Sequence, residues 1–171
     1  MIETERLILR RWKEDDAEDL FRYASDKRVS EMALWTQHTS VEMSLMVIKE
    51  FFIPNPENFA VTDKESGEVI GCIGLVPAGE EHYNPEPGER EVGYWIGLPH
   101  WNKGLATEAL LSLLEYCNRT LGLRSLLLTA DIHNVASLRV AEKCGFIKIG
   151  KYYFNGTESL AYRLRFPEVQ S

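Results

Sequence analysis

EVGYWIGLPHWNKGLATEAL, residues 91 to 110, contains the change of pattern that decides the fold of this chain. Its first part, Glu91–Leu98, combines β-branched and aromatic residues and predicts a strand. After a polar loop, an apolar stripe at helical spacing predicts a helix from about Gly104 to Leu121, with Gly122 as a left-handed C-cap. The stripe consists of Ala106, Leu110, Leu113, Leu114, Cys117 and Leu121. A helix start therefore follows directly on a strand end.

The start of this helix is suited to bind an anion. The first N–H groups of a helix have no intrahelical acceptor and carry partial positive charge. Gly104 lets a ligand approach the backbone, Ala106 is nearly as small, and Lys103 adds charge. Phosphate is the natural candidate, with an ordinary loop-to-helix junction as the alternative. The patterns G-x-x-x-x-G-K-[ST] and, after an early strand, G-x-G-x-x-G are missing, which disfavours ATP and dinucleotides.

The other predicted elements form a mixed α/β order around this segment. The expected strands lie at residues 6–12, 59–62, 69–76, 126–132 and on both sides of Asn155–Gly156, a type I′ hairpin signal. The expected helices lie at residues 15–24, from 40 to the stop at Pro54, and at 134–143. Residues 77–90, rich in Pro, Gly and Glu, predict a loop. This order predicts an α/β sandwich.

The bulk composition narrows the class of protein. A length of 171 residues with 44% hydrophobic content predicts a single domain over residues 1–171. A formal charge of −7 disfavours a nucleic-acid partner. Charges interrupt the apolar runs at the N-terminus and no stretch is long enough to cross a membrane, so we expect a cytoplasmic protein without a membrane partner. Cys72, Cys117 and Cys144 are widely spaced, and the histidines lack metal-like spacing, so we expect reduced thiols and no metal.

Three segments together resemble the GNAT superfamily of N-acetyltransferases. Residues 91–110 resemble its acetyl-CoA-binding strand, loop and helix, and NVASLRVAEKCGF, residues 134–146, resembles its next segment. ETERLILRRW, residues 3–12, is similar to the first strand of the ribosomal-protein N-terminal (RimJ/RimL-like) branch. The resemblance covers essentially the whole chain. It implies a GNAT-like acyl-CoA N-acyltransferase fold, with a central mostly antiparallel twisted sheet, splayed parallel strands and flanking helices.

The resemblance implies a set of residues that bind CoA. The family's pyrophosphate loop, [QR]-x-x-G-x-[GA], falls on residues 101–106, with Trp101 replacing Gln or Arg, a change familiar in the ribosomal-protein-like branch. The pantetheine arm would lie between residues 94–98 and 130–134. Gly93 and Gly97 suit a bulge or a close approach of backbone to ligand. The implied CoA-binding residues are Tyr94, Trp95, Ile96, Gly97, Leu98, Trp101, Asn102, Lys103, Gly104, Leu105, Ala106, Thr107, Asn134 and Ser137.

The same resemblance implies catalytic roles. The backbone N–H of Trp95 or Ile96 would donate to the thioester carbonyl oxygen. Ser137, on the first turn of its helix, would help to protonate the leaving thiolate. Many relatives use a Tyr for that task, but Ala141 stands at its position, which favours Ser137. Local hydrogen bonding is the alternative role for Ser137, and capping the helix is the alternative role for Asn134.

The base that takes the proton of the amine is left open by the sequence. Glu91 matches a strand carboxylate that some relatives use directly or through water, and a strand-pairing Glu is the alternative. Tyr152 stands where the ribosomal-protein branch can place a Glu, so an ordered water chain to bulk solvent is a second route. His133 is expected to be structural or exposed.

The resulting hypothesis is an acetyl-CoA-dependent N-acetyltransferase that works by direct transfer in a ternary complex. The first acceptor to consider is a protein N-terminal amine, such as that of a ribosomal protein. A small amine (polyamine, amino acid or antibiotic) is one alternative, and a non-catalytic CoA-binding regulatory module is another. Either a monomer or a homodimer is compatible. Segments 30–40, 77–90 and 150–157 would line the acceptor pocket, with aromatic walls from Trp35, Tyr152, Tyr153 and Phe154, and the acidic loop could attract a cation.

Overall fold

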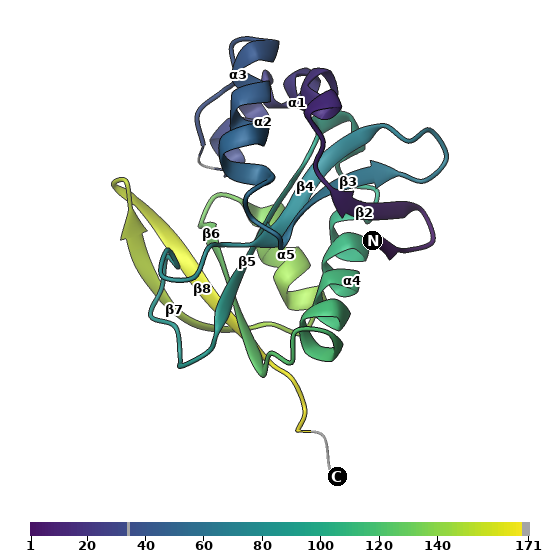
Figure 1. Cartoon of the computed structure of the whole chain (residues 1–171). Coiled ribbons are helices and arrows are strands. Elements are labelled where there is room, and N and C mark those ends of the chain that lie inside the picture. The colour runs from purple at the N-terminus through teal and green to yellow at the C-terminus, as the bar shows by residue number, and fades with distance from the viewer. Residues whose placement is uncertain (34, 169–171) are drawn as a thin grey trace. The chain divides into compact units, whose positions relative to one another are not determined.

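The computed structural model describes residues 1–33 and 35–168. Within these residues it contains eight strands and five α-helices (Figure 1). The chain forms two compact units, one made of Met1–Gly74 and Tyr94–Ser112, the other of Leu75–Gly93 and the chain from Leu113 onward. Strand β5 (Arg90–Ile96) and helix α4 (Leu105–Arg119) each contribute residues to both units. Each unit is therefore described by itself.

The first unit contains an antiparallel sheet with helices α1 and α3 packed on one face (Figure 1). The strands β1 to β4 neighbour one another in chain order, and the end of β5 lies beside β4, where the Gly97 N–H donates to the Ile70 carbonyl at 2.8 Å. The bounds are β1 Ile2–Glu3, β2 Leu7–Arg11, β3 Asn58–Asp63, β4 Val69–Leu75, α1 Ala17–Ala24, α2 Lys27–Ala33 and α3 Val41–Val47. Apolar residues of α1, Ile48 after α3, and Ala60, Val69 and Cys72 of the strands form one core cluster.

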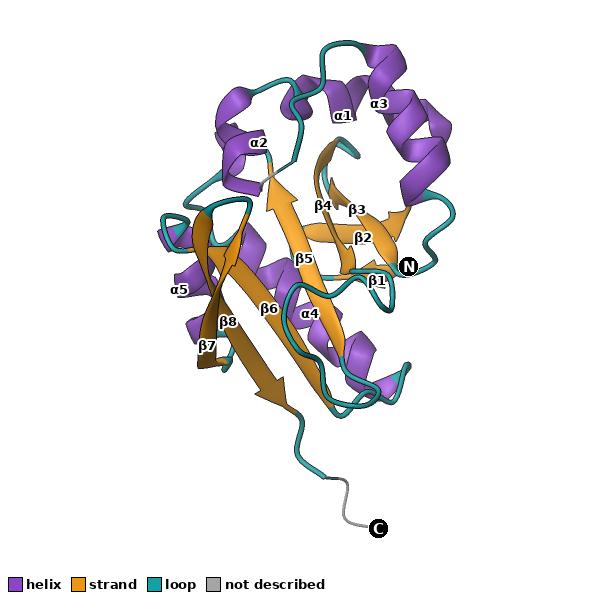
Figure 2. Ribbon diagram, turned by 90° about the vertical axis from the view of Figure 1, so that its left-hand side faces the viewer, coloured by secondary structure: helices purple, strands orange, loops and turns teal. Residues whose placement is uncertain are grey.

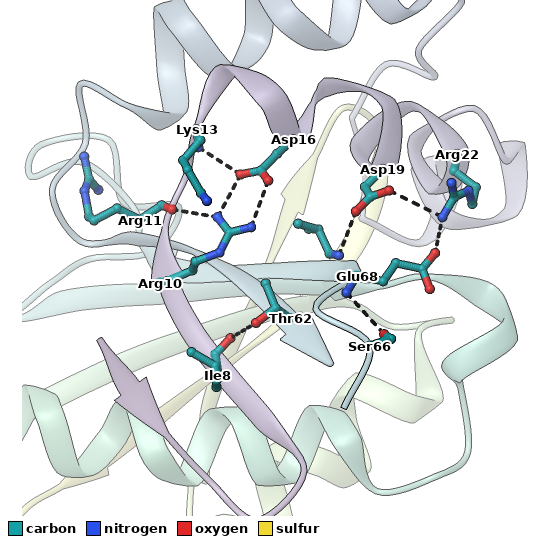
Figure 3. A network of polar contacts seen from close by, with 11 residues as sticks. Ile8, Arg10, Arg11, Lys13, Asp16, Asp19, Arg22, Thr62, Ser66 and Glu68 are labelled. Atoms are coloured by element: carbon teal, nitrogen blue, oxygen red, sulfur yellow. Dashed lines mark hydrogen bonds and ion pairs between the residues drawn. The ribbon is translucent and has the colours of Figure 1, made fainter. Parts of the chain in front are cut away.

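Local polar contacts fix where these helices begin. The Ser40 hydroxyl accepts from the Met43 N–H at 3.0 Å and caps α3, which begins where the sequence predicts a helix. Arg10 of β2 makes a two-bond ion pair with Asp16, whose carboxylate also accepts from the Lys13 N–H at 2.8 Å (Figure 3). Because Asp16 is 6% exposed, this pair joins β2 to the start of α1 in a partly dry environment.

The second unit holds the one parallel strand pair among the described residues. Residues Arg90–Val92 of β5 pair in parallel with Leu126–Leu128 of β6, and the order continues β6, β8, β7 with antiparallel pairing (Figure 2). The bounds are β6 Ser125–Asp131, α5 Val135–Lys143, β7 Ile147–Phe154 and β8 Thr157–Arg165. The hairpin between β7 and β8 turns at Asn155 and Gly156, both at positive φ (49° and 79°), as a type I′ turn requires.

The predicted fold class is confirmed, with small differences in the elements. The mixed α/β order and the mostly antiparallel sheet agree with the prediction, and Gly122 has the expected left-handed φ of 66°. The predicted strand Glu91–Leu98 is too long, because Leu98–His100 forms a 3-10 turn around Pro99. Helix α2 and strand β1 are not predicted, since seven and two residues are too few to show a period. The single domain over residues 1–171 stays a prediction.

The cysteines and the apolar stripe of α4 lie largely in the interior. Cys72, Cys117 and Cys144 are buried, and no disulfide joins them. Most of the predicted stripe of α4 is buried, and Leu110, Leu113 and Cys117 are completely inaccessible. None of the helices in the described residues has the length and apolar character that a membrane crossing needs.

Candidate active site

The loop before α4 has the backbone geometry of an anion site. Asn102 and Gly104 both have positive φ, 61° and 76°, and residues 102–104 are exposed. The Gly104 carbonyl accepts from the Glu108 N–H at 3.0 Å, so Gly104 is the residue at which the helix starts. The N–H groups of Leu105, Ala106 and Thr107 then lie in the first turn, where a helix offers no internal acceptor. First-turn amides beside the exposed Lys103 can hold a diphosphate.

Arg6 braces this loop from the start of the chain. Its Nη1 donates to the Lys103 carbonyl at 2.9 Å, and its Nε donates to Glu108 Oε1 at 2.8 Å. Glu108 Oε2 accepts from the Arg6 N–H at 2.9 Å and from the Thr4 hydroxyl at 2.6 Å. These contacts of Arg6 with Lys103 and Glu108, called the brace below, therefore fix both sides of the helix start. They were not predicted from the sequence.

Trp101 is an unusual residue type at the first position of the loop pattern, and its side chain turns back toward β5. Its indole N–H donates to the Ile96 carbonyl at 2.6 Å, and the backbone between them is closed by the bond from His100 N–H to the Gly97 carbonyl at 2.9 Å. An aromatic residue can replace Gln or Arg here because it closes the turn between β5 and the loop.

The two glycines of the β5 segment differ in their surroundings. A Cβ at Gly97 would lie 2.5 Å from the Tyr23 ring, so the missing side chain at Gly97 is explained by packing within the unit. A Cβ at Gly93 would meet nothing within 4 Å, and this position is exposed. Of the two positions predicted to allow a ligand to approach, Gly93 keeps open space.

Trp95 lies in an aromatic cluster of the first unit. Its ring meets Trp35 edge-on with centroids 5.7 Å apart, and Trp35 also contacts the His38 ring at 5.5 Å. The Trp35 indole N–H is buried and has no hydrogen-bond partner among the described residues. A buried donor without a partner is the kind of group that a bound ligand satisfies, which agrees with the expected place of Trp35 in an acceptor wall.

Asn134 and Ser137 lie at the start of α5 in the second unit. The Asn134 side-chain carbonyl accepts from the Ser137 N–H at 3.2 Å, so Asn134 caps the helix as its residue type predicts. Ser137 is half-buried on the first turn. Ala141, at the position where many relatives have Tyr, is completely buried. The capping role of Asn134 is confirmed, and a contact of either residue with CoA stays a prediction.

Glu91 is buried in the second unit and its carboxylate is well supplied with donors. It is 2% exposed and accepts from the His82 N–H at 2.8 Å, from the His82 ring nitrogen Nδ1 at 2.7 Å and from the Thr129 hydroxyl at 3.1 Å. Its side chain therefore contacts loop 77–89 as well as β6. Sequence reasoning found Glu91 but missed His82, because a loop has no periodicity to indicate which residue faces the strand.

Loop 77–89 is held against the sheet of its unit. Glu89 is buried and forms two bonds of 2.7 Å with Arg163 of β8, and Glu86 pairs with Arg165. The Tyr83 ring lies 5.9 Å from that of Tyr152. The acidic residues of the loop are Glu80, Glu81, Glu86 and Glu89. Two of these four, Glu86 and Glu89, are paired with arginines of the same unit, which reduces their attraction for a cation.

The comparisons with known proteins identify the family. The model of the acetyltransferase (GNAT) domain matches residues 6–147. The chain belongs to the GNAT family of acetyltransferases. It is 32% identical over 151 residues to an uncharacterized N-acetyltransferase, p20, of Bacillus licheniformis, covering 86% of this chain and 82% of that protein. The GNAT-type N-acetyltransferase expected from the sequence is confirmed at this level.

Two solved structures show the same fold. A GNAT-family acetyltransferase from Bacillus anthracis superimposes with a TM-score of 0.82 at 23% identity, covering 96% of this chain and 97% of that one. The spermidine N-acetyltransferase of Vibrio cholerae, in complex with CoA and spermine, gives a TM-score of 0.76 at 20% identity, covering 95% and 96%. At these identities the likeness extends to the fold alone.

Proposed function

We propose that this GNAT acetyltransferase transfers the acetyl group of acetyl-CoA directly to a primary amine, with a peptide N-terminus as the first acceptor class. The observation that carries the cofactor assignment is the loop at Asn102–Gly104. Two left-handed residues, the first-turn amides of α4 and the exposed Lys103 together supply what a diphosphate needs. The residues that hold it would be Trp101 through Thr107, and those beside the pantetheine arm would be Tyr94 through Leu98.

The chemistry divides among a few groups. The N–H of Trp95 or Ile96 would donate to the thioester oxygen as negative charge develops there. The neutral amine attacks the carbonyl carbon, the carbon–sulfur bond breaks, and the Ser137 hydroxyl would donate a proton to the thiolate. Asn134 would orient the arm next to Ser137. Glu91 would belong to the part of the site that removes the ammonium proton.

The acceptor class rests on two lines of support. The opening segment ETERLILRRW and the aromatic Trp101 resemble the ribosomal-protein branch, which favours a protein N-terminus. A polyamine is the second candidate, because the similar fold from Vibrio cholerae is that of a spermidine N-acetyltransferase. The formal charge of −7 suits either cationic acceptor.

Mass spectrometry of products separates these candidates. The full chain is incubated with acetyl-CoA and, in separate reactions, peptides with different N-terminal residues, spermidine, free amino acids and an aminoglycoside. Acetylation at a peptide α-amine supports the first class, and acetylation of spermidine alone replaces it with the second. Tight binding of acetyl-CoA in calorimetry without turnover on any amine would contradict the transferase function and favour a CoA-binding regulatory module.

A further inference from the structure

His82 and Glu91 form a hydrogen-bonded pair that the proposed mechanism has not yet used. Glu91 Oε2 lies 2.7 Å from His82 Nδ1, and Glu91 Oε1 accepts from the backbone N–H of His82 at 2.8 Å. The carboxylate therefore holds both the backbone and the ring of one residue. Such double attachment fixes the direction of the imidazole, as a carboxylate does in many catalytic dyads.

The partner at Nδ1 decides the tautomer of the ring. A carboxylate can only accept, so Nδ1 carries the hydrogen in the neutral imidazole and Nε2 keeps the free electron pair. The Thr129 hydroxyl donates to the same oxygen of Glu91 at 3.1 Å, which helps to hold the carboxylate in place. The ring edge is further confined by Phe154, whose ring lies perpendicular to it with centroids 5.1 Å apart.

Exposure separates the roles of the two residues. The Glu91 side chain is 3% exposed, whereas the His82 side chain is 35% exposed. An amine from solution can meet the imidazole but has little access to the carboxylate. We propose that His82 Nε2 is the group that accepts the ammonium proton of the acceptor, and that Glu91 is its positioning residue. This assignment rests on the acetyl transfer proposed above and names its base.

The electrostatics of the pair suit this task. The hydrogen bond from Glu91 raises the pKa of His82, and burial opposes the rise. Tyr152 of β7 is a further titratable group that interacts with Glu91, and burial raises the pKa of Tyr152. A base whose pKa lies close to the working pH is the most effective in general base catalysis.

The proton balance of the step is complete. The R–NH3+ group of the acceptor loses one proton to Nε2, and the imidazole becomes an imidazolium beside the Glu91 carboxylate. The neutral amine then forms the new carbon–nitrogen bond as the carbon–sulfur bond breaks. The imidazolium passes its proton to solvent through its exposed edge before the next cycle.

The first test reads the tautomer and needs no activity. Long-range 1H–15N spectra of the labelled full chain give the protonation of each histidine ring, and His82→Gln assigns the signals of His82. We expect the neutral ring to carry its hydrogen on Nδ1, and Glu91→Gln to lower the pKa of His82 because the negative charge is lost. A hydrogen on Nε2, or an unchanged pKa in Glu91→Gln, overturns the proposal.

The second test measures transfer to the amine that the wild-type protein acetylates. We expect His82→Ala to lower kcat by about 10²-fold or more while the KM for acetyl-CoA stays within about twofold, and added imidazole to restore part of the rate. His82→Gln keeps an amide donor for Glu91. Its melting temperature should therefore be closer to that of the wild type than the melting temperature of His82→Ala is, while its kcat should stay as low as that of His82→Ala. Imidazole should give no gain in the wild type or in Ser137→Ala.

The outcomes separate this inference from the proposed function. A wild type that transfers acetyl while His82→Ala keeps its rate and pH profile contradicts the role of His82 and leaves the function standing. A wild type that transfers to no amine contradicts the function, and the ring spectra still decide the geometry of the pair. Full activity of His82→Gln would contradict the role of His82 as the base and would leave it only the role of holding loop 77–89 against Glu91.

Discussion

Arg6 and Glu108, which are 102 positions apart in the sequence, form an ion pair of 2.8 Å at the start of α4. The same guanidinium holds the Lys103 carbonyl at 2.9 Å, so one side chain sets the shape of the loop on both sides of Gly104. The connection between β1 and β2 therefore shapes the segment that we assign to the diphosphate.

Removing this brace should weaken acetyl-CoA binding more than it weakens the fold. In Arg6→Ala, the loop loses charge-assisted hydrogen bonds, and we expect the Kd for acetyl-CoA to rise about tenfold, in line with about 1.5 kcal/mol for such bonds. Arg6→Lys cannot make both contacts from one planar group and should recover only part of the loss. Calorimetric titration measures the Kd. Lys49→Ala removes a cation of similar exposure (54% against 47% for Arg6) and controls for net charge. An equal rise in Kd in Lys49→Ala would contradict the role of the Arg6 contacts.

The two glycines of the β5 segment should respond in opposite ways to alanine. Gly97→Ala drives a methyl group into the Tyr23 ring, and we expect a loss of about 1–3 kcal/mol in the free energy of unfolding, typical of overpacking. Gly93→Ala meets open space and should keep the melting temperature, while any ligand backbone passing there would be obstructed. Urea unfolding and the KM for acetyl-CoA are the two measurements. A stable Gly97→Ala would show that Tyr23 moves aside freely.

The buried pair of Glu89 and Arg163 should be sensitive to loss of one partner. Glu89 has no exposed side-chain surface, and Glu89→Gln removes the nearer of the two carboxylates beside Arg163. Glu86 Oε1, 3.5 Å from Arg163 Nη1, remains as a partly exposed countercharge. We therefore expect a loss of about 3 kcal/mol in the free energy of unfolding, the low end for a broken buried pair. Glu86→Gln, at an exposed pair with Arg165, should cost less than about 1 kcal/mol. Urea denaturation gives both values. Equal effects of the two changes would contradict the importance of burial.

Two histidines should act on stability in opposite directions as the pH changes. Burial lowers the pKa of His38, so the unfolded chain binds the proton more readily, and stability falls as the pH drops below about 6.5. Glu91 raises the pKa of His82, so its contribution is full below about 6.5 and is lost as the pH rises through the folded pKa. His100 acts in the direction of His38 because burial lowers its pKa as well.

The measurement is the urea midpoint between pH 5 and 8. His38→Asn places an amide near the Ser44 hydroxyl, which lies 2.7 Å from His38 Nδ1, and should flatten the acid limb of the curve. His82→Gln should flatten the alkaline limb instead. Unchanged slopes in both variants would show that neither histidine titrates differently in the folded protein.

Local features of this chain could be predicted from the sequence, and distant contacts could not. The helix start at Ser40, the cap at Asn134 and the turn at Asn155–Gly156 depend on residues within a few positions, and each was predicted. The brace of Arg6 joins residues far apart in the chain, so no periodicity indicates it. The His82–Glu91 bond spans nine positions, but it depends on how an irregular loop folds back on a strand.

The same limit applies to the packing role of Gly97. Sequence pattern can indicate that a strand glycine allows close approach, but only the structure shows that Tyr23, 74 positions earlier, fills the space. The family resemblance could propose site residues in segments far apart in the chain, because it carries long-range information that spacing lacks. It did not indicate His82 of loop 77–89, which we propose as the base.

The burial of all three thiols has a practical consequence for enzymology. Cys117 is completely inaccessible, Cys72 and Cys144 are 7% and 8% exposed, and burial raises the pKa of Cys72 to about 12. Aromatic disulfide reagents react with thiolates that they can reach. A colorimetric signal from such a reagent would therefore report the free coenzyme released at each turnover, with little background from the folded catalyst itself.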